Sequence, residues 1–463
     1  MIGSVTHHVR QWDYRLFLSI LLFIALPNLY RLYRVRLIGN EIPDPGGLAT
    51  VAQWQFVGLI VEVFQEATVL AVFFFLGSQI RSSALIKADR AKSVLSFIFI
   101  SSLVFAAIVF LLRGAFIELI DTPEDIRAQT SAFLGVSAFS IPFMLVSAAL
   151  VVLLQALGMS RHVLLLAVFN VLLLFTLDSL LFGGYAFSLG AGAVGVGVST
   201  LLSSVGLFAA GALLLLFAGG LPARYFLTLP TFQDIREFLR VGFGSGLDSA
   251  VRNAAYFIMI IRLVNTIGTT EISGYYVAIQ IFWGFMLVPV LAFADSSKAL
   301  VANTSDDLER VRTLWRASML ITGGMMVVWI ALIPWFPAFA GALSDDPEIV
   351  DAAIIAFGIL FVPYVLFCFN TVTDSVFYGL GKTQYMAYQS ILTNGTVYVA
   401  AFLLYISGVW DVTYVGIMVL FALGIIVDTV LTLWFLVRVL SADGGAPFGF
   451  RLRQLAFPPP AER

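Results

Sequence analysis

Charged residues are scarce in this chain: Asp, Glu, Lys and Arg together make up 12% of its 463 residues, whereas apolar residues make up 60%. The mean hydropathy is +0.97. A chain with so little polar side-chain surface cannot cover a water-soluble globule of this size. The composition therefore excludes an ordinary soluble domain and predicts an integral membrane protein, with the lipid bilayer as its surroundings.

Residues with catalytic or metal-binding chemistry are also few. There are three histidines, His7, His8 and His162, and one cysteine, Cys368, so an internal disulfide cannot form. The sequence contains no metal-ligand spacing and no phosphate-binding motif. Its net charge of −2 is distributed over the loops, which leaves no basic face for a nucleic acid. We expect no enzyme, no metal, no cofactor and no nucleic-acid partner, and a buried thiol at Cys368.

Long apolar runs, in contrast, are abundant. Runs of about 20 or more mostly apolar residues, the length that crosses a hydrocarbon layer about 30 Å thick, occur twelve times. They lie near 16–38, 51–78, 93–112, 130–156, 162–183, 190–218, 238–265, 274–301, 316–340, 350–378, 387–407 and 412–440. The sequence therefore predicts an all-α membrane protein with twelve transmembrane helices.

The charges of the connecting loops alternate in sign. Basic residues gather in 81–92, in 224–240 and after 438, whereas the alternate loops carry acids such as Glu41 and Asp345. Lys and Arg are enriched in cytoplasmic loops. We therefore expect a multi-pass protein of the plasma membrane with both termini in the cytoplasm.

A turn and the apolar run after it occur twice, about 223 residues apart. Leu-Gly-Met-Ser-Arg at 157–161 aligns with Leu-Gly-Lys-Thr-Gln at 380–384, and Asn170 then falls within one residue of Asn394. Such a repeat predicts a duplicated architecture, with the functional site between the halves.

The halves are predicted to be an N-terminal six-helix lobe at 1–218 and a C-terminal six-helix lobe at 236–440, joined by a cytoplasmic linker at 219–235 and followed by a flexible tail at 441–463. Because corresponding helices run in the same direction, the lobes should be related by pseudo-two-fold symmetry about the membrane normal.

An acidic turn is part of the same repeat. Asp-Thr-Pro-Glu at 121–124 matches Asp-Asp-Pro-Glu at 345–348. A proline at the start of a helix and acids near its positive end are typical of helix N-termini. Each turn is therefore predicted to cap the helix that follows it.

Glycines are dense at 183–197 and again at Gly242, Gly244 and Gly246. Small residues at these spacings let transmembrane helices approach closely. For the second group, a bend in the seventh helix is an alternative.

Glu62 and Glu66 lie within the second span at positions i and i+4, hence on one face of its helix. A charged side chain near the bilayer centre costs roughly 2.5 to 3.5 kcal/mol. Two such carboxylates repel each other, so at least one should hold a proton at neutral pH. The pair is either a protonation site for transport coupling or is neutralised by hydrogen bonds or by an arginine of the same lobe.

Other polar residues in the spans are weaker candidates. Asp248 and Arg252 are also four residues apart and can neutralise each other within one helix. Asp295 and Lys298 lie near the cytoplasmic end of the eighth span, where long side chains reach the interface. Asn170, with its counterpart in the second half, can join helices by hydrogen bonds. Asp374 and Asp428 also lie toward the cytoplasmic ends of their spans, and a functional role is less favoured for them than for Asp295 and Lys298.

Three motifs carry a resemblance to a known family. These are LxALGxSR at 154–161, NVLxxxxxDxLLFG at 170–183 and GAGAVGVGVST at 190–200. With the duplicated twelve-span pattern, the chain resembles the multidrug and toxic compound extrusion (MATE) family, within the multidrug/oligosaccharidyl-lipid/polysaccharide flippase (MOP) superfamily. The resemblance implies two six-helix bundles in a V, with a central cleft that opens alternately to either side.

The same resemblance implies a secondary active transporter that exports amphipathic, cationic or xenobiotic compounds, driven by a proton or sodium gradient. The superfamily also includes lipid-linked sugar flippases, so a lipid substrate is the alternative. We expect a small-molecule substrate, a monomer, and no cofactor beyond a coupling ion, H⁺ or Na⁺.

Two positions depart from the family pattern. Where members often carry an aspartate in the first span, this chain has Arg31, and Arg252 replaces a second acidic site that some members use in the seventh span. The resemblance implies that the first-span position lies beside Asp178 of the fifth span.

Arg31 follows Leu16 by 15 residues and Asp178 follows His162 by 16, so at 1.5 Å per residue both lie about 23 Å deep. The hypothesis is that the Arg31 guanidinium takes the place of the transported cation and pairs with Asp178. In the alternative, Arg31 turns outward with Arg34 and Arg36 toward the headgroups.

Overall fold

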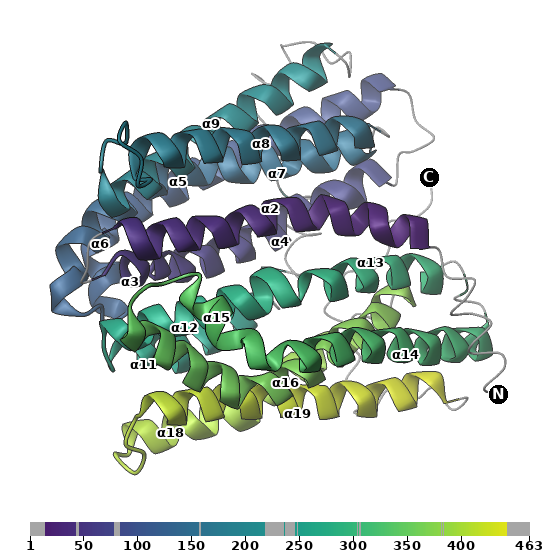
Figure 1. The fold of residues 1–463 in the computed structure, drawn as a ribbon. Helices are drawn as coiled ribbons and strands as arrows, with labels where there is room; N and C mark the ends of the chain where they lie inside the picture. The colour runs from purple at the N-terminus through teal and green to yellow at the C-terminus, as the bar shows by residue number, and fades with distance from the viewer. Residues whose placement is uncertain are drawn as a thin grey trace.

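The computed structural model describes residues 14–42, 46–77, 84–156, 159–217, 236, 246–247, 249–302, 304, 307–380, 382 and 384–441. Throughout these ranges the regular structure is helical (Figure 1). The predicted linker at 219–235 and the tail after Ser441 lie outside the described residues.

The first six predicted spans coincide with the helices of an N-terminal lobe. These are α2 (Tyr14–Glu41), α3 (Gly47–Ala52) with α4 (Trp54–Gly77), α5 (Ala84–Leu119), α6 (Glu124–Ser137) continued through η1 (Ala138–Ser140) into α7 (Ile141–Ala156), α8 (Ser160–Leu181) and α9 (Gly192–Phe217).

The second six spans coincide with helices of a C-terminal lobe, and the first of these is described mainly from residue 249. They are the helical segment 249–256 with η3 (Phe257–Ile261) and α11 (Arg262–Asn265), α12 (Thr269–Ile281) with η4 (Phe282–Met286) and α13 (Val288–Ala302), α14 (Leu308–Leu332) with η5 (Ile333–Trp335) and α15 (Phe336–Gly341), α16 (Pro347–Gly379), α17 (Gln384–Thr393) with η6 (Asn394–Tyr398) and α18 (Val399–Ile406), and α19 (Tyr414–Leu440).

Within the described ranges, nine helices are long and apolar enough to cross a membrane, and the pair around Leu287, bent by 42°, makes a tenth. The all-α membrane fold predicted from the composition is confirmed.

The two lobes lie side by side. Figure 1 shows α5, α7, α8 and α9 on one side and α14, α16 and α19 on the other, with α2 and α13 adjacent between them. Helix α2 packs against α8 of its own lobe and against α13 of the other, and α3 packs against α12. Helix α2 begins, and α19 ends, on the same side of the bundle (Figure 1), as the even number of spans requires.

Small residues allow close helix contacts, as predicted. A Cβ on Gly197 of α9 would lie 2.9 Å from Ser137 Oγ, and one on Gly246 would lie 2.7 Å from Ala67 Cβ of α4. Gly242 and Gly244 lie outside the described residues. Cys368 is fully buried, which confirms its expected place in the core.

Both acidic turns precede a helix as predicted, but only the second forms a side-chain cap. Helix α6 follows Pro123 and carries Glu124 and Asp125 in its first turn. Helix α16 begins at Pro347, and the side chain of Asp346 accepts a hydrogen bond from the Glu348 backbone N–H at 2.9 Å. Acids at these positions interact favourably with the positive end of the helix.

Candidate functional site

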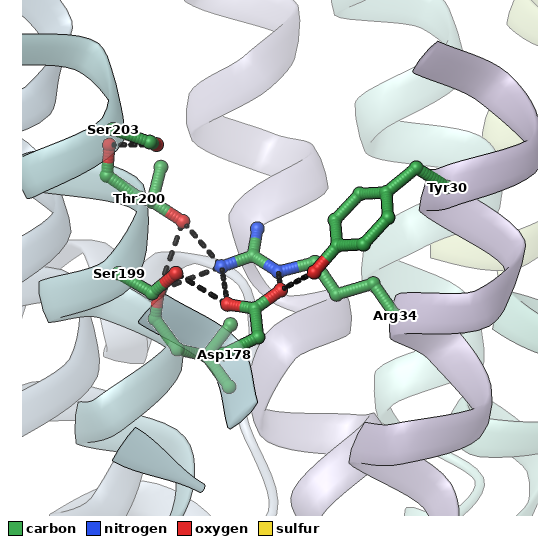
Figure 2. A network of polar contacts seen from close by, with 7 residues as sticks. Tyr30, Arg34, Asp178, Ser199, Thr200 and Ser203 are labelled. Atoms are coloured by element: carbon green, nitrogen blue, oxygen red, sulfur yellow. Dashed lines mark hydrogen bonds and ion pairs between the residues drawn. The ribbon is translucent and has the colours of Figure 1, made fainter. Parts of the chain in front are cut away.

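Asp178, near the end of α8, is fully buried and is held by three side chains (Figure 2). The Arg34 guanidinium forms an ion pair with it, with Nε 2.9 Å from Oδ2 and Nη2 3.2 Å from Oδ1. The Tyr30 hydroxyl donates to Oδ2 at 2.5 Å, and the Ser199 hydroxyl donates to Oδ1. Both carboxylate oxygens therefore have donors on α2 or α9, and the negative charge is compensated inside the lobe.

Arg34 is itself fixed by α9. Its Nη2 donates to the Val196 carbonyl oxygen and to the Thr200 hydroxyl, at 3.0 Å each (Figure 2). Tyr30 and Arg34 are one helical turn apart on α2, so both reach the junction of α8 and α9 from one face. The guanidinium thus occupies a cage of oxygens from two helices, and only 17% of its side chain is exposed.

The pairing predicted for Arg31 is wrong. Arg31 is exposed, and the cation at Asp178 is Arg34, three residues further along α2. The depth estimate assumed straight helices starting at Leu16 and His162, and residue counting alone does not fix depth to better than about one turn when helices tilt. The alternative is wrong for Arg34, which does not turn outward with Arg31 and Arg36 but is the partner of Asp178. Ser199, Thr200 and Tyr30 were missed, although Ser199 and Thr200 end the 190–200 motif.

A second charged group joins the lobes at mid-span. Arg252, on the segment 249–256, places Nη2 3.1 Å from Glu62 Oε1 and 3.1 Å from Glu66 Oε1 of α4. The exposed fractions of these side chains are 45% for Arg252 and Glu62 and 25% for Glu66. The prediction that the two glutamates share one helix face is confirmed.

The neutralising arginine comes from the opposite lobe, not from the same lobe as predicted. Because Arg252 binds both glutamates, it offsets the repulsion that suggested a protonated carboxyl. Its predicted partner Asp248 lies outside the described residues. Spacing within one helix favoured Asp248, whereas contacts between the halves of the chain leave no local pattern in the sequence.

A buried amide pair connects the lobes on the side of the acidic loops. Gln53 Nε2 donates to Asn265 Oδ1 at 3.2 Å, and Asn265 Nδ2 donates to Gln53 Oε1 at 2.8 Å and to the Ile120 carbonyl at 2.7 Å. Both side chains are almost fully buried, so each provides the hydrogen-bond partner that the amide of the other needs away from water.

Around this pair the contact is charged. Arg262 Nε lies 2.6 Å from Asp121 Oδ2, and the Thr269 hydroxyl donates to Asp125 Oδ2 at 2.8 Å. Asp121 has a φ of 50°, a conformation that few non-glycine residues adopt. The turn after α5 thus directs its acids toward the C-terminal lobe as well as toward α6.

A third polar cluster lies within the C-terminal lobe. Asp428 of α19 accepts hydrogen bonds from Asn370 Nδ2 at 2.7 Å, Gln389 Nε2 at 2.9 Å and the Thr393 hydroxyl at 3.3 Å. Asp374, one turn after Asn370 on α16, is within electrostatic range of Asp428.

The C-terminal cluster has more acceptors than donors. In the described part of the chain, Asn370 Oδ1, Gln389 Oε1 and Asp374 Oδ1 are buried without a hydrogen-bond partner. Oxygen ligands of this kind suit a small hard cation or a proton. Asp374 and Asp428 were less favoured from the sequence, because the partners of Asp428 come from α16 and α17 and cannot be read from α19 alone.

The remaining candidates are local. Lys298 Nζ lies 2.8 Å from Asp295 Oδ1 in the same helix, and both side chains are over one-third exposed, as predicted for the interface. Asn394 donates to Ser390 within its own helix at 3.2 Å, so the helix-joining bond predicted for it is not formed. Asn170 is half-buried on α8, and no hydrogen bond of its side chain is found among the described residues.

Comparisons with known proteins agree on one family. The sequence profile of the MatE family matches residues 247–403. A curated relative, "Probable multidrug resistance protein NorM" of Pseudomonas putida, is 25% identical over 237 residues, which is 50% of this chain and 51% of the relative. The matched region therefore spans about half the length of that relative.

Solved structures match over nearly the whole chain. A MATE transporter of the MOP superfamily in an inward-facing conformation is 19% identical, with 92% of this chain and 98% of that chain covered and a TM-score of 0.76. A mutant of the Vibrio cholerae transporter VcmN is 15% identical, with 95% of this chain and 98% of that chain covered and a TM-score of 0.67. A MOP transporter from Pyrococcus furiosus is 18% identical, with 94% of this chain and 96% of that chain covered and a TM-score of 0.66.

At these identities the structural matches establish the fold, a pair of six-helix bundles. The chain is similar in sequence to the MatE family over residues 247–403 and similar in fold to solved MATE transporters of the MOP superfamily.

Proposed function

We propose that this protein is a secondary active transporter that exports amphipathic organic cations across the plasma membrane. The group formed by Glu62, Glu66 and Arg252 carries the proposal. These side chains lie at mid-span between the lobes and remain 25% to 45% exposed. Charges in the interior of a membrane must be paired or face water, so their exposed parts fit a water-filled space between the lobes.

Such a space gives an organic cation a place to bind. The three side chains together carry one net negative charge, and the aromatic content of the chain, 14%, provides apolar surface for an amphipathic body. Relatives named a probable multidrug resistance protein and a multidrug resistance transporter support the export of drug-like compounds. Alternating access between the lobes would then move the cation.

We place ion coupling in the C-terminal lobe. Asp178 already has its counter-charge in Arg34, and an arginine keeps its proton under physiological conditions. The cluster of Asp374 and Asp428 has no arginine in such an ion pair among the described residues, and three buried oxygens there, Asn370 Oδ1, Gln389 Oε1 and Asp374 Oδ1, have no hydrogen-bond partner in that part of the chain. A proton or Na⁺ entering from the driving gradient would supply the missing positive charge.

One observation favours a lipid substrate instead. Arg31 and Arg36 are exposed on α2, the helix between the lobes, and arginines bind phosphate strongly. The Pyrococcus furiosus transporter is described as having a binding pocket of reverse polarity and a different function. A flippase for a lipid or lipid-linked sugar is therefore the second candidate.

Reconstituted vesicles separate the two candidates. With an imposed pH or Na⁺ gradient, we expect gradient-dependent movement of a fluorescent organic cation, and its loss in the Asp374→Asn and Asp428→Asn double variant. Flipping of a fluorescent lipid, with no movement of the cation, would instead establish the flippase. The Asp295→Asn variant, which alters an exposed interfacial acid, serves as the control.

A further inference from the structure

Arg252 is already bound where the proposed function places the substrate cation. A single nitrogen, Nη2, lies 3.1 Å from one oxygen of each glutamate. The two oxygens are therefore at most about 6 Å apart, because neither is further than 3.1 Å from that nitrogen. A diffusible cation can reach both carboxylates only if Arg252 moves away.

The geometry also restricts the chemistry of the cation. Nη2 carries two N–H groups, one for each glutamate oxygen, and charge-assisted hydrogen bonds of this kind are stronger than neutral ones. A protonated primary or secondary amine, or an amidine, presents at least two N–H groups and can replace Nη2. A quaternary ammonium has none, so it would leave both carboxylate oxygens without a donor.

Displacement of Arg252 would remove a tie between the lobes, because the glutamates belong to α4 and the arginine to the segment 249–256 of the C-terminal lobe.

We propose that Arg252 is a resident cation that a substrate must displace from Glu62 and Glu66, and that this exchange selects cations bearing N–H groups over quaternary ones. The proposal rests on the cation site of the proposed function and adds its selectivity. The resident guanidinium lowers the affinity for every cation, and the two glutamate oxygens then discriminate between cations by their hydrogen-bond donors.

A matched pair of probes tests the selectivity. Dansylcadaverine carries a primary ammonium, and its N,N,N-trimethyl derivative carries the same charge without N–H. Fluorescence titration of the purified full-length protein should give a Kd for the primary amine at least about tenfold lower, the effect of one or two charge-assisted hydrogen bonds at a partly exposed site. Equal Kd values would overturn the selectivity.

Variants test the role of Arg252. Arg252→Gln removes the competing charge, so the Kd for the amine should fall several-fold, whereas Arg252→Lys keeps a resident cation and should bind as the wild type does. Arg312→Gln is the control, since Arg312 pairs with Glu309 within α14 of a single lobe, and its Kd should be unchanged. An unchanged or higher Kd in a folded Arg252→Gln variant, or no binding of the amine by the wild type and this variant, would refute the resident-cation role.

The outcomes also separate this inference from the proposed function. If the amine is transported along the gradient but its Kd is unaltered in Arg252→Gln, the export function is supported and the resident-cation role is refuted. If the Kd falls in Arg252→Gln as expected but no gradient-driven transport occurs, the resident-cation role is supported and the export function is refuted.

Discussion

Arg34 on α2 and Asp178 on α8 form a buried ion pair with Nε 2.9 Å from Oδ2, and a third helix, α9, contacts both partners through Ser199, Thr200 and the Val196 carbonyl. The pair therefore acts as a charged junction of three helices of the N-terminal lobe. Since the cation is covalently attached, this lobe carries its compensating charge through every conformation of a transport cycle.

The junction should be costly to break from either side. Arg34→Ala leaves Asp178 buried without its cation, and Asp178→Ala leaves the guanidinium without its anion; each should lower the free energy of unfolding by roughly 3 to 5 kcal/mol. Thermal unfolding in detergent measures this. The Arg34→Leu and Asp178→Leu double variant should cost clearly less than the sum of the two single leucine variants.

Arg31→Ala is the control for this junction, because Arg31 is exposed, and its melting temperature should stay close to that of the wild type. If Arg31→Ala proved as destabilising as Arg34→Ala, the assignment of Arg34 as the partner of Asp178 would be refuted.

Glu62 and Glu66 should matter for transport more than for folding. Their ion pairs with Arg252 are partly exposed, and such pairs contribute only about 0 to 1 kcal/mol to stability. Glu62→Gln and Glu66→Gln should each weaken export of a cationic substrate, and the double variant should abolish it while the melting temperature changes little. Glu309→Gln, an acid that is 78% exposed at the start of α14, should transport normally. Normal transport by the double variant would remove these glutamates from the substrate path.

Periodicity and composition were sufficient for the fold but not for the pairing of the charges. The apolar runs located the described helices, because span length is set by the bilayer, although α5 and α14 begin at Ala84 and Leu308, before the predicted 93 and 316. Asp178 was found because a carboxylate in an apolar run needs compensation. Its partner was misassigned by about one turn, since Arg31 and Arg34 lie within one turn of each other and only packing selects Arg34.

Contacts between distant segments were beyond the reach of spacing rules. A pair at i and i+4, such as Asp248 and Arg252, is visible in one helix, whereas Glu62 lies 190 residues from Arg252 in the sequence and its contact leaves no local pattern. Asp428 gave no local sign of its role, because Asn370 and Gln389 approach it from two other helices. Neutral amides near a carboxylate become informative only after the helices are packed.

The hydrogen bonds to Asp428 make a prediction about stability. Asp428→Leu leaves the amides of Asn370 and Gln389 buried without an acceptor, at a cost of about 1 to 3 kcal/mol for each unsatisfied group. Asp428→Asn keeps an acceptor oxygen and should cost less. Unfolding in detergent should therefore rank the wild type above Asp428→Asn and Asp428→Asn above Asp428→Leu. Equal stability of the two variants would mean that these bonds are not formed in the membrane protein.

The contact between Asp121 and Arg262 allows a direct test of lobe movement. The side chains are 40% and 38% exposed, so the ion pair itself adds little stability, yet it lies where the lobes must part if the cleft is to open on the side of the acidic loops. Cysteines at both positions, in a Cys368→Ala background, can be joined by a short bifunctional thiosulfonate reagent. The cross-link should stop cation export, and reduction should restore it, because alternating access requires both sides to open in turn.

The matched control joins cysteines at Glu309 and Arg312, which form an ion pair within α14 of a single lobe. This cross-link lies within one lobe and does not join it to the other, so export should continue after complete modification. Continued export with a complete cross-link between positions 121 and 262 would show that the lobes do not separate there, and the transport cycle would then need a different moving part. Loss of export in both cross-linked proteins would point to a general effect of the reagent, and the tie between Asp121 and Arg262 would lose its role as a gate.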